Sequence, residues 1–113
     1  MQESHTAVIE RNVTWQGTFA TEPYEAAWAS EALFFVRVLA KENTLEGLAA
    51  RVQISPDGMH WCNEGEILQI PTTDGNGDLA FCRVEQFGGW LRLAGEVPAG
   101  ASVTVIVYLV LKG

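Results

Sequence analysis

The strongest constraint on the fold is the apolar run from Ser102 to Lys112. Its apolar residues recur with a period of two, which places alternate side chains on one face of an extended strand. That face carries Val103, Val105, Val107, Leu109 and Leu111. Ile106, Tyr108 and Val110 lie on the opposite face, so both faces of the strand require cover. The run is too short for a membrane helix, which needs about twenty residues, and it predicts a buried β-strand.

The same period of two recurs along the chain and predicts further strands. The predicted segments are 6–10, 12–19, 33–39, 48–54, 59–62, 66–70, 79–86, 90–94 and 102–112. Turn-forming residues separate many of them, at 55–58, 73–78, 88–89 and 98–100. We therefore predict an all-β fold, a β-sandwich or jelly roll of about eight antiparallel strands.

One segment differs from this pattern. Residues 22–32 combine a proline near the start with good helix formers, so they form at most one short helix near 23–32 or an extended loop. At 113 residues, of which 48% are hydrophobic and 19% charged, the chain is expected to form a single β-sandwich domain over 1–113. Residues 1–5 are expected to be mobile.

The net charge of −7 argues against binding to nucleic acid or to an anionic membrane, because both depend on clustered lysine and arginine. The first ten residues lack the basic start and apolar stretch of a secretory signal. We therefore expect a cytoplasmic protein, or part of a particle assembled there, with no signal peptide or transmembrane segment.

Two cysteines, Cys62 and Cys82, are too few for a disulfide framework and lack the CxxC spacing of zinc sites. Two reduced thiols are expected, and a bridge between them stays open if their strands are neighbours.

The motif Ser55-Pro-Asp-Gly-Met-His-Trp61 is the most specific local signal in the chain. Asp57-Gly58 favours a tight reversal, and Ser55 and Asp57 can accept hydrogen bonds from its amides. Trp61 is expected to fold over this hairpin. The motif resembles a hairpin of discoidin-like jelly-roll β-sandwich modules, and Trp90-Leu-Arg-Leu93 is similar to the strand that follows it there. The resemblance implies a β-sandwich. It carries over no ligand-binding loop, so we interpret the motif as a structural hairpin.

Asp74, Asn76 and Asp78 have the one-three-five spacing of a calcium loop, and Glu85 falls at position twelve. Leu79 occupies the position that requires glycine, so a hairpin tip is the better interpretation, and no metal or other cofactor is expected.

The sequence contains few candidate catalytic residues. The only histidines are His5 and His60, and the nearest nucleophile to the second is Cys62. We expect no catalytic residues and no enzymatic activity.

Tryptophan is frequent for a chain of this length, with four residues at positions 15, 28, 61 and 90. Trp28 lies with Tyr24 in the segment outside the predicted strands, and acidic residues surround both. The candidate binding residues, for a protein partner or a glycan, are therefore Tyr24, Trp28, Trp61 and Trp90.

Two functions follow from these features. The first is a non-enzymatic structural or accessory subunit that forms homo-oligomers or decorates a larger capsid-like or shell-like assembly, because apolar strands that lack cover favour association. The alternative is a carbohydrate-binding module that uses its surface tryptophans.

Overall fold

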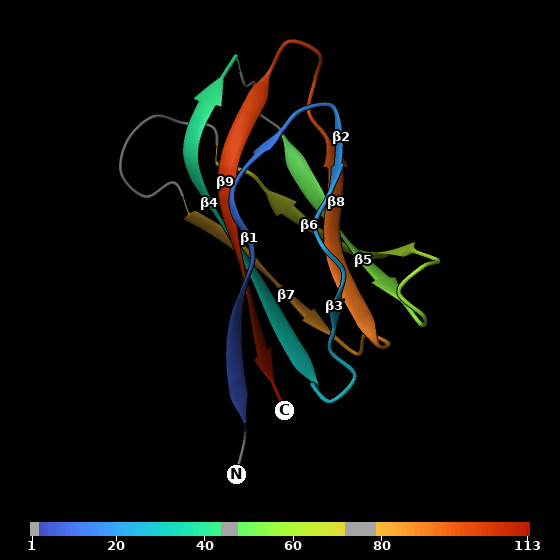
Figure 1. The fold of residues 1–113 in the computed structure, drawn as a ribbon. Helices are drawn as coiled ribbons and strands as arrows, with labels where there is room; N and C mark the ends of the chain where they lie inside the picture. The colour runs from blue at the N-terminus through green and yellow to red at the C-terminus, as the bar shows by residue number, and fades with distance from the viewer. Residues whose placement is uncertain (1–2, 44–47, 72–78) are drawn as a thin grey trace.

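A computed structural model describes residues 3–43, 48–71 and 79–113, and these residues form nine β-strands and no helix (Figure 1). The strands are β1 (Ser4–Trp15), β2 (Thr18–Ala20), β3 (Tyr24–Glu25), β4 (Glu31–Glu42), β5 (Ala49–Ser55), β6 (Cys62–Gln69), β7 (Leu79–Glu85), β8 (Trp90–Glu96) and β9 (Ser102–Lys112). Nothing in the described part of the chain is a helix that could cross a bilayer.

The strands form two antiparallel sheets that pack face to face, which confirms the predicted all-β sandwich (Figure 1). Sheet A has the order β1-β9-β4-β7, and sheet B has the order β2-β8-β5-β6 with β3 also paired to β8. Every strand pair in both sheets is antiparallel. Apart from the β5–β6 hairpin, neighbouring strands in each sheet come from distant parts of the sequence, so the fold depends largely on long-range pairing.

Strand β9 behaves as its sequence predicts on its inner face. Its alternate residues from Val103 to Leu111 are completely buried between the sheets. β1 pairs with one side of β9 and β4 with the other. On the outer face Ile106, Tyr108 and Val110 are only partly buried, and the segment around Tyr24 pairs with sheet B instead of covering them.

Strand β1 continues through the point where two separate strands were predicted. The register against β9 shifts between Val8 and Glu10 and again between Glu10 and Val13, and Asn12 has a positive φ of 54°. These β-bulges take up extra residues without ending the strand. Ser4 and His5, which were expected to be mobile, pair with Lys112 and Leu111.

Residues 22–32 adopt the extended alternative and form no helix. β3 pairs with β8 through Tyr24 and Glu25, and a turn follows in which the Ala29 amide donates to the Ala26 carbonyl. The expected strand at 59–62 is also absent, because only Cys62 belongs to a strand and residues 56–60 form bends. A single strand, β6, then covers most of the expected strand at 66–70.

The two thiols are both free, so the alternative of a disulfide bridge is wrong. Cys62 is exposed on β6 of sheet B, whereas Cys82 is buried on β7 of sheet A. Burial raises the pKa of Cys82 to about 12, with smaller contributions from the negative charges of Glu66 and Glu64. Cys82 therefore stays protonated at neutral pH and belongs to the core.

Gly95 lies at a tight contact between β8 and the core. It pairs with Phe19 of β2 and Ala50 of β5. A Cβ atom at this position would lie 2.8 Å from the Phe19 ring and 2.9 Å from the Ala49 carbonyl oxygen. The Phe19 ring is itself stacked on Trp15, with ring centroids 3.9 Å apart. The backbone of β8 therefore approaches this aromatic pair only because Gly95 has no side chain.

We predict that Gly95→Ala lowers the free energy of unfolding by about 1–3 kcal/mol, the usual cost of overpacking. The matched control is Gly88→Ala, because a Cβ at Gly88 would meet its nearest atom, the Ser55 carbonyl oxygen, at 3.6 Å. Urea unfolding of both variants measures the difference. Equal stability of the two variants would show that the contact with Phe19 is not tight.

Candidate functional site

The four aromatic residues predicted from the sequence as binding residues lie in two places. Tyr24 and Trp28 line one open cleft. Trp61 and Trp90 lie by the hairpin at the end of sheet B, where each packs against another part of the chain. The structure thus places Tyr24 and Trp28 together and separates them from Trp61 and Trp90.

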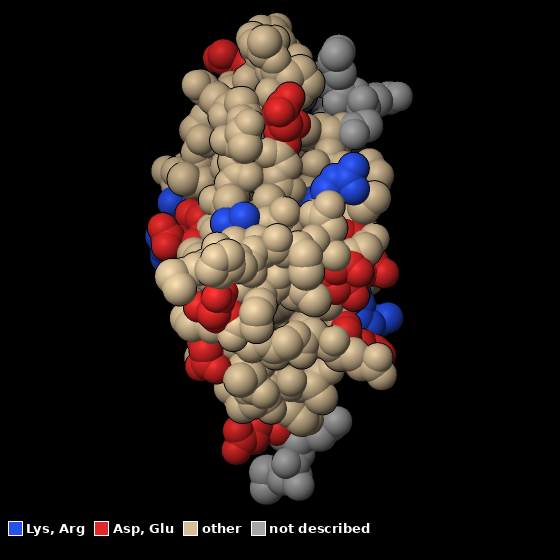
Figure 2. Space-filling model, turned by 90° about the vertical axis from the view of Figure 1, so that its right-hand side faces the viewer, with Lys and Arg blue, Asp and Glu red and all other residues tan. Residues whose placement is uncertain are grey.

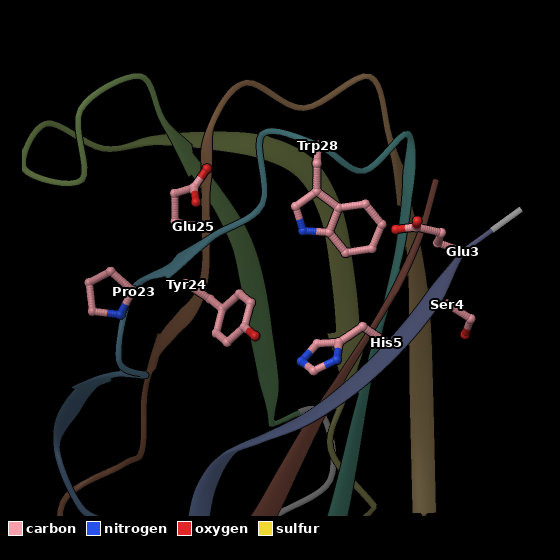
Figure 3. A pocket seen from close by; sticks show the side chains of 7 residues that line it. All are labelled: Glu3, Ser4, His5, Pro23, Tyr24, Glu25 and Trp28. Carbon is pink, nitrogen blue, oxygen red and sulfur yellow. The ribbon is translucent and has the colours of Figure 1, made fainter.

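The first place, called here the aromatic cleft, has a volume of about 830 Å³. The beginning of β1 and the segment around β3 form its walls, with lining residues Glu3, Ser4, His5, Pro23, Tyr24, Glu25 and Trp28. Figure 3 shows the rings of Trp28, Tyr24 and His5 facing a common space, with the Glu3 carboxylate directed toward Trp28. Trp28 is 46% exposed, so much of its indole surface is free to contact a ligand.

Backbone hydrogen bonds hold the cleft together. The Gly113 amide donates to the Glu3 carbonyl, and the Ser30 amide donates to the Lys112 carbonyl. One carboxylate oxygen of Glu25 accepts a hydrogen bond from the Ala27 amide. These contacts fix both walls relative to β9. An exposed indole beside carboxylates can stack on a sugar ring or on a cation.

The hairpin between β5 and β6 is organised by two side chains. Ser55 Oγ accepts hydrogen bonds from the amides of Asp57 and Gly58. Asp57 accepts from the amides of Met59 and His60, and its second oxygen lies 2.7 Å from His60 Nδ1. The backbone hydrogen bond from His60 is the largest of several contacts that hold the pKa of Asp57 well below its ordinary range. Ser55 and Asp57 thus accept hydrogen bonds from the amides of the turn, as the sequence predicts.

Trp90 packs against this hairpin, a position that the sequence interpretation gave to Trp61. A Cβ at Gly58, whose φ is +80°, would lie 3.1 Å from the Trp90 ring. Because this contact covers part of the Trp90 ring, Trp90 is a poor candidate for a surface on which a ligand could stack.

Trp61 instead contacts Arg92 on the outer face of sheet B. The Arg92 guanidinium carbon lies 4.3 Å from the centroid of the Trp61 ring. Arg92 Nε donates to Gln53 Oε1 at 2.8 Å, and Gln53 Nε2 donates to Asn63 Oδ1 at 3.1 Å. Partial burial lowers the pKa of Arg92, but a guanidinium stays charged at neutral pH.

The outer face of sheet A is a different kind of surface, called here the apolar face. Its residues, identified from the register with the outward positions of β9, are Val8, Leu33, Phe35, Leu79, Phe81, Ile106, Tyr108 and Val110. Phe81 is 54% exposed and Leu79 is 52% exposed. The rings of Phe35 and Phe81 contact each other, with centroids 5.6 Å apart. An exposed apolar surface across several strands is typical of an interaction site.

The structure adds no support for catalysis. His60 is held by Asp57, and no hydrogen bond joins it to Cys62 in the described ranges. Cys62 Sγ instead lies 3.8 Å from the Ile54 carbonyl oxygen. Among the residues that the structure describes, no three His, Cys, Asp or Glu side chains are placed to hold a metal ion. The calcium candidates Asp74, Asn76 and Asp78 lie outside the described residues.

Sequence reasoning missed two features of these surfaces. His5 belongs to the aromatic cleft because β1 begins beside β3, and no local pattern announces that proximity. The contact between Trp61 and Arg92 joins two strands of sheet B. Arg51 and Gln53 alternate with buried residues of β5, but the pairing of β5 with β8 was needed to connect them with Arg92.

Comparisons with known proteins assign no family to the chain. No protein-family model matches it, and no curated protein matches it. Among solved structures, it aligns with the crystal structure of FLHE at a TM-score of 0.43 and 15% sequence identity, over 99% of this chain and 95% of that chain.

Proposed function

We propose that the protein is a non-enzymatic structural or accessory subunit that associates with copies of itself through the apolar face. The exposure of Phe81 and Leu79, each above one half, carries this proposal. In a monomer these side chains are partly exposed to water. Burying an apolar side chain of this kind completely stabilises the buried state by about 1.5–3 kcal/mol relative to leaving it exposed. Association removes that exposed surface.

The charges at the outward positions of sheet A favour a second copy as the occupant. Three basic residues, Arg37, Arg83 and Lys112, are balanced there by three acidic residues, Glu31, Glu42 and Glu85. The whole chain carries a charge of −7, so two copies repel each other over most of their surface. The outward positions of sheet A are less acidic than the chain as a whole, although Glu64 and Glu66 of β6 line a hollow with Phe81. Two copies therefore approach with less repulsion through this face than through the rest of the surface.

The geometry of the face also suits a symmetric contact. A sheet presents a broad, gently twisted surface, and two such surfaces pack about 10 Å apart. In a twofold contact each basic residue can meet an acidic residue of the other copy, which sets the orientation. The same face can anchor the protein as a decoration on a larger assembly. Neither nucleic acid nor a membrane is part of this proposal.

We predict that the protein forms a dimer or larger oligomer at micromolar concentration and that Phe81→Lys shifts it toward the monomer of 12.4 kDa. Lysine places a charge in the middle of the apolar contact. Met59→Lys is the matched control, because Met59 is 74% exposed in the hairpin and lies off the apolar face.

Sedimentation velocity combined with light scattering measures the mass of each variant. A wild-type protein that remains monomeric across the micromolar range contradicts the proposal, and so does an equal shift in both variants.

The second candidate function is carbohydrate binding in the aromatic cleft. The specific observation in its favour is that Trp28 is 46% exposed and faces Tyr24 and His5 across an open space (Figure 3). Exposed indoles stack on the apolar faces of sugar rings, while carboxylates accept hydrogen bonds from sugar hydroxyls. In this function Trp61 and Trp90 take no direct part, because each contacts another part of the chain.

Under this second function, neutral oligosaccharides are expected to quench tryptophan fluorescence, and Trp28→Leu is expected to weaken binding at least about tenfold through the lost stacking. Met59→Ala serves as the control. A glycan array without a neutral ligand, or a Trp28→Leu variant that binds as the wild type does, would exclude the cleft as a sugar site.

A further inference from the structure

The outer face of sheet B contains an arginine whose side chain is held in place by two contacts. The planar Arg92 guanidinium lies over the Trp61 ring and donates its Nε hydrogen to Gln53. Both contacts restrict the side chain before any ligand arrives, so little rotamer entropy remains to be lost on binding. The terminal nitrogens of Arg92 make no hydrogen bond to any described residue.

The hydrogen bonds around Arg92 have a fixed direction. Arginine only donates, so Gln53 must present its carbonyl oxygen to Arg92 and its NH2 group to Asn63. Asn63 accepts that bond through its oxygen and is left with its own NH2 group as a donor. The network therefore ends in donor groups at both ends, Arg92 at one end and Asn63 at the other.

A second arginine lies on the same face. Arg51 precedes Gln53 by two residues on β5, so both side chains point outward. Neither Arg51 nor Arg92 forms an ion pair with a carboxylate in the described ranges. Figure 2 looks onto the side of the molecule where sheet B lies: acidic residues gather mainly along its margins, and basic groups lie between them. Two basic residues therefore lie on one face of a chain whose net charge is −7.

These residues surround a shallow basin of about 640 Å³, which is within the range of about 300–1,000 Å³ for small-molecule sites. The small outward residues Ala20 and Ala94 leave its floor open. The lining also includes Thr18, Phe19, Gly95 and Glu96. Glu96 lies four residues beyond Arg92 on β8, about 13 Å away at 3.3 Å per residue. The basin therefore has a donor-rich end and an acidic end.

We propose that this basin binds a saccharide that carries a carboxylate group. The carboxylate takes the donor-rich end, where the Arg92 fork and Arg51 match its two oxygens. The sugar ring lies over the small residues of the floor, and its hydroxyls meet Thr18, Asn63 and Glu96. This inference does not depend on the apolar face of sheet A. It also differs from neutral sugar binding in the aromatic cleft, because its recognition is electrostatic.

Isothermal titration calorimetry tests the proposal by measuring the affinity of three probes. They are a galacturonate trisaccharide, the uncharged galactose trisaccharide of the same linkage, and inorganic phosphate. We expect the galacturonate to bind at least about tenfold more tightly than the galactose, because a charge-assisted pair contributes about 1.5–3 kcal/mol. Its affinity should fall as salt is added. Equal binding of both trisaccharides overturns recognition of the carboxylate. Phosphate that binds as tightly as galacturonate overturns recognition of the saccharide.

Variants locate the binding on the protein. Arg92→Gln is expected to lose about tenfold or more in galacturonate affinity. Arg92→Lys keeps the charge but loses the planar fork and should also bind more weakly. Arg11→Gln is the matched control, since it removes an equal charge from an exposed position on β1. The proposal fails if both Arg92 variants bind as the wild type does, or if Arg11→Gln weakens binding equally.

Discussion

The pairing of β9 with β1 on one side and β4 on the other is the interaction on which the rest of the structure depends. It joins three long strands into sheet A and buries the inner face of β9 completely. Sheet B then packs on that face through inward residues such as Leu91 and Leu93 of β8. Without this row of apolar side chains, sheet A would lack the apolar face against which sheet B packs.

This arrangement leaves the molecule with two outer faces of different chemistry. The outer face of sheet A is apolar and has balanced charges, whereas that of sheet B carries a basin with two arginines and two amides. Because side chains alternate along every strand, the residues that form the core also determine which residues reach each outer face. The proposed roles in self-association and in ligand binding therefore use opposite sides of one sandwich and need not compete.

Much of the fold could be predicted from periodicity. The alternation in residues 102–112 predicted β9 together with its buried face, and the strand predicted at 48–54 corresponds to β5. The boundaries were less accurate where a strand contains an irregularity. β1 was divided in two because bulges interrupt its alternation, and residues 59–60 were placed in a strand although their amides bond to Asp57.

The candidate sites were harder to predict because they form between strands that are distant in sequence. Tyr24 and Trp28 are close in the chain and line the same cleft, but His5 joins them only because the beginning of β1 lines that cleft too. Trp61 was expected over its own hairpin and instead contacts Arg92 of β8. The residues of β9 predict that its outer face needs cover. Only the structure shows that the described part of the chain leaves this face partly exposed.

Native-state hydrogen exchange tests the central role of β9 most directly. Each amide of β9 should exchange only through global unfolding, with a protection free energy equal to the unfolding free energy measured in urea. The two-residue strand β3, by contrast, should open at much lower cost. If the amides of Val105, Val107 and Leu109 exchange through local opening, at a lower free energy than those of β8, the account is contradicted.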